Sequence, residues 1–166
     1  MIKHKVSMLG AFAVGKTSLV QRFVTGIFSE RYQTTIGVRI DKREVAIDGK
    51  PSMLMLWDLQ GEDEVHEVPF HHVRGSSGFL VVADGTRPET LDVALRLHRE
   101  ALTLLGNVPN VLLLNKDDLR DSWRLDDDRI EGLQADGMTI ARTSAKTGAA
   151  VPEAFDQLAR AMRPKR

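Results

Sequence analysis

The sequence predicts an α/β fold in which a mostly parallel sheet is covered by helices on both faces. Two observations predict it. Segments with strand character alternate with segments of helical spacing along nearly the whole chain. In addition, residues 78–83 and 111–114 are continuously apolar, which is typical of parallel strands buried on both faces. The length of 166 residues fits a single domain.

The first half of the chain begins with a strand, a glycine-bounded loop and a helix. We expect the strand at residues 5–9 and the helix at residues 17–24. A hairpin follows, because alternating segments at residues 38–47 and 53–57 flank the turn pair at residues 48–49, Asp-Gly. This hairpin supplies one antiparallel edge strand.

The second half adds three helices and a last strand. Apolar residues recur at helical spacing over residues 89–105, and Gly106 ends that helix. Residues 129–135 and 152–162 also have helical character, whereas residues 138–142 have the pattern of a strand. The predicted sheet therefore has six strands, and ligands should bind beyond the carboxyl ends of its parallel strands.

The composition argues against several classes of protein. Lysine and arginine number 23, as do aspartate and glutamate, so no net charge attracts the chain to nucleic acid. There is no cysteine, and therefore no disulfide and no attachment point for a prenyl or palmitoyl chain. No apolar run approaches the roughly 20 residues that span a bilayer. We expect a cytoplasmic protein with no nucleic-acid partner and no stable membrane anchor.

A phosphate-binding motif lies between the first strand and the first helix. Residues 10–17, Gly-Ala-Phe-Ala-Val-Gly-Lys-Thr, match the pattern Gly, four residues, Gly, Lys, then Ser or Thr. The two glycines let the backbone turn so that amide hydrogens and the helix N-terminus meet phosphate oxygens. Lys16 adds a charge at the β and γ phosphates, and the Thr17 hydroxyl is placed to ligate Mg²⁺.

Two polar segments follow buried strands later in the chain. Residues 115–118, Asn-Lys-Asp-Asp, come directly after one strand, and residues 143–146, Thr-Ser-Ala-Lys, come after the next. Both therefore belong at the binding edge of the sheet. They bear on the choice of base, because ATP and GTP present the same triphosphate to a phosphate loop.

With residues 57–61, Trp-Asp-Leu-Gln-Gly, these motifs resemble those of the Ras superfamily of small GTPases. The Rab branch is the most similar, through residues 32–38 and 74–75, and the match runs in order over nearly the whole chain. The resemblance implies a P-loop NTPase G domain over residues 1–166. Such a domain binds GTP or GDP with Mg²⁺ and changes conformation with the nucleotide.

The resemblance also implies individual roles. Asp118 would accept hydrogen bonds from guanine, and Thr17, Thr35 and Asp58 would form the magnesium site. The implied catalytic residues are Lys16, Thr35, Gly61 and Glu62. The implied nucleotide-binding residues are Ala13, Val14, Gly15, Lys16, Thr17, Ser18, Phe28, Tyr32, Thr35, Gly61, Asn115, Lys116, Asp118, Ser144, Ala145 and Lys146.

Some of these assignments compete with plainer ones. Lys116 and Phe28 would enclose the base, but a core position suits Phe28 equally well. The Ala145 amide would meet the guanine carbonyl. Thr34 is a hydroxyl of the same type beside Thr35, although the family spacing favours Thr35.

The resemblance predicts two switch segments, which we call the first switch (residues 29–38) and the second switch (residues 62–73). Thr35 would reach the metal and the γ-phosphate only when that phosphate is present, so its loss would release the first switch. Unidentified effector and regulatory proteins would bind around residues 35–40, Trp57 and the second switch. Trp57 either packs on the sheet or contacts such a partner.

Two positions depart from the family pattern. Glu62 stands where a glutamine normally orients the attacking water, and a carboxylate cannot donate a hydrogen bond to the γ-phosphate and is repelled by it. Phe12 stands where a small residue is usual, and would hinder that water-orienting position and any incoming arginine. Gln60 lies two positions before Glu62, but the resemblance directs it away from the γ-phosphate.

We therefore expect slow GTP hydrolysis. An alternative is a binding module that keeps GTP and offers a fixed platform to partners. A third possibility is an ATP-using P-loop enzyme, which would leave Asp118 without a role.

Overall fold

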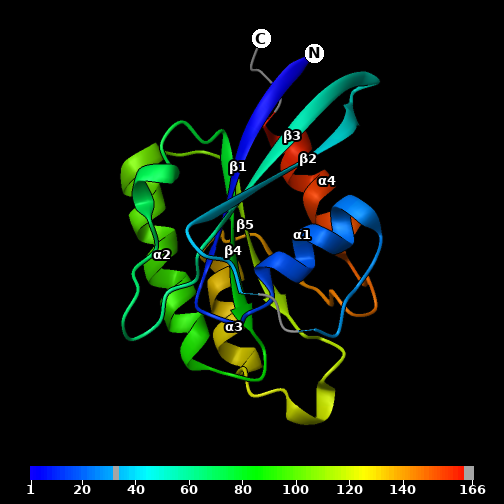
Figure 1. Ribbon diagram of the computed structural model, residues 1–166. Coiled ribbons are helices and arrows are strands. Elements are labelled where there is room, and N and C mark those ends of the chain that lie inside the picture. The colour runs from blue at the N-terminus through cyan, green and yellow to red at the C-terminus, as the bar shows by residue number, and fades with distance from the viewer. Residues whose placement is uncertain (32–33, 163–166) are drawn as a thin grey trace.

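The computed structural model describes residues 1–31 and 34–162, and it shows a six-stranded sheet with helices on both faces (Figure 1). The strands lie in the order β2-β3-β1-β4-β5-β6. Only β2 runs antiparallel to its neighbour, and the remaining pairs are parallel. The strands are β1 (Ile2–Gly10), β2 (Val38–Ile47), β3 (Lys50–Leu59), β4 (Gly78–Asp84), β5 (Asn110–Asn115) and β6 (Ile140–Arg142). This architecture confirms the predicted fold class.

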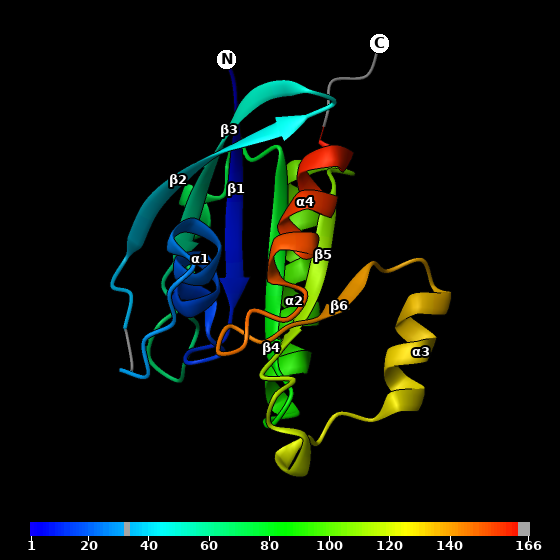
Figure 2. The ribbon, with the colours of Figure 1, turned by 90° about the vertical axis from the view of Figure 1, so that its right-hand side faces the viewer.

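Four α-helices cover the sheet within the described residues. They are α1 (Lys16–Thr25), α2 (Glu89–Leu105), α3 (Asp127–Ala135) and α4 (Val151–Ala161), and short 3₁₀ turns lie at Phe70–His72 and Arg120–Ser122. Apolar residues of α1 and α4 pack into one core layer, and those of α2 and α3 pack into the other. Figure 2 shows α1 and α4 in front of the sheet with α2 behind it.

The burial of each strand reflects its position in the sheet. Every residue of β4 is buried, because β4 lies between β1 and β5 and both of its faces carry helices. The outer strand β2 is largely exposed and rich in charge, as expected of an edge strand. The continuous apolar run of β4 therefore has the origin that we predicted, burial on both faces of the sheet.

Two strands of the first half, β1 and β3, are longer than predicted. β1 begins at Ile2, which pairs with Ser52, and β3 extends from Lys50 to Leu59. Backbone groups make the ladder hydrogen bonds, so a strand can continue through polar side chains that carry no apolar signal. The hairpin turn agrees with the prediction, since Asp48 and Gly49 have φ values of 51° and 76°, as a two-residue turn with left-handed residues requires.

The C-terminal helix fixes the first helix through an aromatic stack. The apolar residues of α4 recur at helical spacing and are buried. Among them, Phe155 stacks on Phe23 of α1 with ring centroids 4.1 Å apart and an interplanar angle of 4°. This contact holds α1, whose first residue follows the phosphate loop. Within residues 1–31 and 34–162, no helix has both the length and the apolar character that crossing a bilayer requires.

We predict that Phe155→Ala lowers the free energy of unfolding by about 3–5 kcal/mol, because it leaves a cavity beside Phe23 in a close-packed layer. Urea denaturation measures this. Gln157→Ala on the exposed side of the same helix is the control, and we expect a change within about 0.5 kcal/mol. Equal effects of the two substitutions would contradict the packing described above.

Candidate functional site

A cavity of about 390 Å³ lies beyond the carboxyl ends of β1 and β5. Its walls come from the phosphate loop, the first switch, the end of β3, and the loops after β5 and β6. It is lined by Phe12, Ala13, Gly15, Lys16, Thr17, Ser18, Phe28, Ser29, Glu30, Arg31, Thr34, Thr35, Leu59, Gly61, Asn115, Lys116, Asp118, Leu119, Ala145 and Lys146. Its position is the one at which a parallel α/β sheet binds its ligand.

The phosphate loop is held in a strained conformation against the end of β5. Gly15 has φ 99°, and a Cβ atom there would lie 2.3 Å from Asn115 Nδ2. Asn115 Nδ2 in turn donates to the carbonyl of Val14 at 3.0 Å. Ala13 also has a positive φ, of 63°, which costs energy for a residue with a side chain. The strain and the close approach both indicate that this loop is shaped for a ligand.

Lys16 is a buried cation at the N-terminus of α1. Its Nζ donates to the carbonyls of Ala11 at 3.0 Å and Gly10 at 3.4 Å. Burial lowers the pKa of Lys16 from 10.5 to about 8; the Asp58 carboxylate raises it in part, and Arg87 lowers it further. A buried ammonium group with only carbonyl acceptors would gain from a phosphate oxygen.

Three side-chain oxygens meet beside Lys16. Thr17 Oγ1 donates to Asp58 Oδ2 at 2.6 Å and lies 2.6 Å from Thr35 Oγ1. Thr35 Oγ1 is itself 3.4 Å from the same Asp58 oxygen. Thr34 lines the cavity too, but it is Thr35 that makes the contact with Thr17.

The oxygen set fits a small divalent cation. Asp58 is fully buried, and burial raises the pKa of its carboxyl. Its second oxygen, Oδ1, has no hydrogen-bond partner among the residues that the structure describes. An oxygen donor set with one unsatisfied carboxylate oxygen is what Mg²⁺ prefers.

The other end of the cavity carries Asp118. Its Oδ1 accepts a hydrogen bond from Ser144 Oγ at 2.7 Å. Asn115 Oδ1 accepts from the Ala145 amide at 3.3 Å and from Thr143 Oγ1 at 3.3 Å. The loops after β5 and β6 are thus joined behind the cavity, and the Asp118 carboxylate is oriented at its rim.

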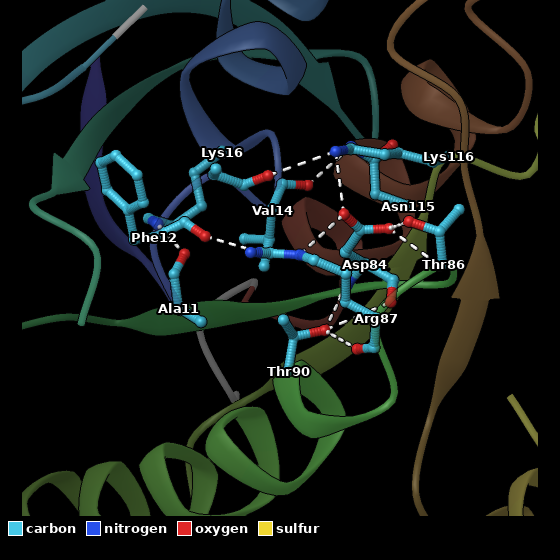
Figure 3. A network of polar contacts seen from close by, with 11 residues as sticks. Ala11, Phe12, Val14, Lys16, Asp84, Thr86, Arg87, Thr90, Asn115 and Lys116 are labelled. Carbon is cyan, nitrogen blue, oxygen red and sulfur yellow. Dashed lines mark hydrogen bonds and ion pairs between the residues drawn. The ribbon is translucent and has the colours of Figure 1, made fainter. Parts of the chain in front are cut away.

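A network around Asp84 links the two ends of the cavity, and sequence reasoning missed it (Figure 3). Asp84 Oδ2 lies 2.8 Å from Lys116 Nζ and 3.2 Å from Arg87 Nε. Arg87 Nη2 donates to the Phe12 carbonyl at 2.6 Å, and Lys116 Nζ donates to the Ala13 carbonyl at 3.3 Å. The available signal was a carboxylate directly after the continuously apolar run of β4.

The charge of Asp84 is well compensated although the residue is 1% exposed. Burial acts to raise the pKa of its carboxyl, but hydrogen bonds from Lys116 and Thr86 outweigh burial and lower the pKa. The ionised carboxylate is therefore the stable form, and it holds both cations against the phosphate loop.

Most of the predicted nucleotide-binding residues line the cavity. Those that do are Ala13, Gly15, Lys16, Thr17, Ser18, Phe28, Thr35, Gly61, Asn115, Lys116, Asp118, Ala145 and Lys146. Val14 and Ser144 are buried behind the cavity. The Val14 carbonyl accepts a hydrogen bond from Asn115, and the Ser144 hydroxyl donates one to Asp118. Phe28 both lines the cavity and packs against the core. The predicted contact of Tyr32 lies outside the described residues.

The structure does not bring the Glu62 side chain to the cavity. Glu62 instead forms an ion pair with Arg96 of α2. The Gln60 side chain also points away from the cavity, because its Oε1 accepts a hydrogen bond from the Gly37 backbone amide at 2.9 Å. The backbone amide of Gln60 donates to the Gly37 carbonyl at 2.8 Å. Gln60 therefore joins the end of β3 to the first switch.

Trp57 is half-buried between neighbours on the protein surface. Lys5 Nζ lies 3.8 Å from the centroid of its ring, and the His72 ring is 5.9 Å away. These contacts pack Trp57 against β1 and the second switch, while part of the side chain stays accessible.

The chain is similar over most of its length to proteins of one family. The family model described as "Ras family" matches residues 5–164. The chain is 33% identical over 158 residues to the Ras-related protein Rab-8B of Homo sapiens, and the aligned region covers 94% of this chain and 76% of that protein. It is 31% identical over 164 residues to the Ras-related protein Rab-1 of Theileria annulata, and that alignment covers 97% of this chain and 74% of the relative.

We predict that Lys16 makes the nucleotide-free protein more stable as the pH rises from about 8 to 10.5. In this window the unfolded chain keeps the Lys16 proton and the folded chain does not, so raising the pH removes a cost of folding. The full difference is at most about 3 kcal/mol.

Urea denaturation of the unaltered chain and of Lys16→Met across this pH range measures the effect. The variant lacks the titrating group, so its free energy of unfolding should rise less steeply with pH. Parallel pH profiles for the two proteins would contradict the prediction.

Proposed function

The chain belongs to the Ras family, as its sequence motifs indicated, and on that premise we propose that it is a Rab-like switch that binds GTP and GDP with Mg²⁺ and hydrolyses GTP slowly. One observation carries the proposal: the oxygens of Thr17, Thr35 and Asp58 meet at one end of a cavity whose other end presents Asp118. We also propose that residues 1–166 form a single G domain.

Asp118 would select the base. Its carboxylate can accept hydrogen bonds from the ring N–H and the exocyclic amine of guanine, groups that adenine does not offer in that arrangement. Ser144 holds one of its oxygens in place. The Ala145 amide, which donates to Asn115 Oδ1 at a long 3.3 Å, would also bond the guanine carbonyl. A carboxylate whose partners are missing is costly, so this site would discriminate strongly against adenine.

The phosphate end would be bound by the loop amides, by Lys16 and by the metal. Thr17, Thr35 and Asp58 would hold Mg²⁺. Bound Mg²⁺ supplies charge neutralisation at the β and γ phosphate oxygens. Thr35 would couple the first switch to the γ-phosphate, since its hydroxyl lies among these oxygens.

The residues that face the cavity support the proposal of slow hydrolysis. A water molecule that attacks the γ-phosphate needs a group to orient it. Neither the Gln60 amide nor the Glu62 carboxylate lines the cavity, because one bonds Gly37 and the other Arg96. Phe12 does line it, with 37% of the residue exposed, and would crowd the position of the water. The other implied catalytic residues, Lys16, Thr35 and Gly61, would then act mainly by binding the phosphates.

A GTP-bound platform is the second candidate, and the Gln60 contact favours it. The two hydrogen bonds between Gln60 and Gly37 hold part of the first switch to β3 without help from a phosphate. Partner proteins would then meet a fixed surface with exposed apolar residues at Ile36, Ile40 and Val65. Decay of bound GTP over hours would distinguish a switch from a platform.

We predict that Asp118→Ala weakens GDP binding at least about 100-fold, because two charge-assisted hydrogen bonds to guanine are lost. Competition against labelled GDP measures this. Asp121→Asn in the next turn of the chain, whose side chain is exposed, should leave the affinity unchanged. If excess ATP displaced GDP from the unaltered chain as well as GTP does, the assignment of the base would be wrong.

We predict that single-turnover GTP hydrolysis proceeds at or below about 10⁻⁴ s⁻¹ without a partner, since that is near the intrinsic rate of a small GTPase that has its glutamine. Glu62→Gln should not slow it, because the glutamine restores a donor that orients water. A rate near 10⁻² s⁻¹, which is about that of GTPases with a built-in arginine, would rule out the slow switch.

A further inference from the structure

The ion pair between Glu62 and Arg96 keeps the Glu62 carboxylate out of the cavity, but the function proposed above gives Arg96 no role in nucleotide binding. Arg96 lies in the middle of α2, and its guanidinium bonds Glu62 through Nη2 and Glu100 through Nη1, the latter at 3.1 Å. The Glu62 side chain is 18% exposed and that of Arg96 is 40% exposed. The pair is therefore partly shielded from water, and it joins the start of the second switch to a helix of the rigid core.

The backbone of Glu62 is fixed against the phosphate loop. Its carbonyl accepts from the Phe12 amide at 2.8 Å, and its amide donates to the Gly10 carbonyl at 3.2 Å. Gly61, directly before it, approaches so closely that a Cβ atom there would lie 2.7 Å from Phe12 Cα. With the backbone fixed, rotation of the Glu62 side chain decides whether its carboxylate faces α2 or the cavity.

The direction of that carboxylate matters for the γ-phosphate. Gly61 lines the cavity and Glu62 follows it in the chain, so a carboxylate turned inward would lie near the third phosphate of GTP. GDP has no such phosphate and would be far less sensitive to it. Two like charges in a site that excludes much of the water repel each other appreciably.

We infer that Arg96 is a positioning residue that draws the Glu62 carboxylate onto α2 and so keeps it away from the γ-phosphate of GTP. This rests on the proposed binding of guanine nucleotides. Arg96 thereby reduces the repulsion between a glutamate at this position and GTP. Arg96 changes the ratio of the affinities for the two nucleotides without contacting either nucleotide.

The test compares the affinities of the full chain for GDP and for a non-hydrolysable GTP analogue, both with Mg²⁺. Arg96→Ala releases Glu62, and we expect the ratio of the two affinities to move about tenfold against the GTP analogue. Arg96→Lys keeps the charge and should largely keep the ratio. Adding Glu62→Gln to Arg96→Ala should restore the ratio, because the released carboxylate is gone.

Arg99→Ala, an exposed arginine of the same helix, is the matched control and should leave the ratio unchanged. Thermal unfolding of each variant checks that it is folded. If Arg96→Ala weakened both nucleotides equally, or if the double substitution did not restore the ratio, Arg96 would have only a structural role and the inference would fail alone. Failure of the unaltered chain to bind either nucleotide would overturn the inference and the proposed function together.

Discussion

The burial of the Lys16 ammonium group is the constraint on which the rest of the site depends. A cation removed from water is costly unless acceptors surround it, and here the loop itself supplies the carbonyls of Gly10 and Ala11. Those carbonyls face the cation only because the loop turns through two residues with positive φ, Ala13 and Gly15. The shape of the loop and the charge at its centre are thus one structural feature.

Asn115 transmits this geometry to the other end of the cavity. A single side chain donates to the carbonyl of Val14 and accepts from Thr143 and the Ala145 amide. Because Asn115 ends the buried strand β5, the parts that face phosphate and base are held by the core of the sheet. The first switch has fewer such contacts, which come from the hydroxyl of Thr35 and from the side chain and backbone amide of Gln60. This difference in rigidity is what a conformational switch requires.

Local patterns predicted the fold where one segment carried its own signal. Helix α2 has the predicted bounds, because a glycine ends its helical periodicity, and β2 has the predicted bounds, because a hairpin turn ends it. The start of β1 was missed, since backbone pairing with β3 fixes it. The network of Asp84 and Arg87 and the direction of Glu62 depend on contacts between residues far apart in the chain. The assignments of individual binding residues, Thr35 among them, stay predictions.

The paired hydrogen bonds between Gln60 and Gly37 join the first switch directly to the residue that follows β3. A protein that binds only the first switch would contact a segment bonded to the end of β3, from which Gly61 and Glu62 continue. Its binding would therefore depend on the conformation of residues that it does not contact. Recognition of one small surface patch would then report on the condition of the whole phosphate end. This link depends on the side-chain and backbone amide groups of Gln60 and on the backbone of Gly37.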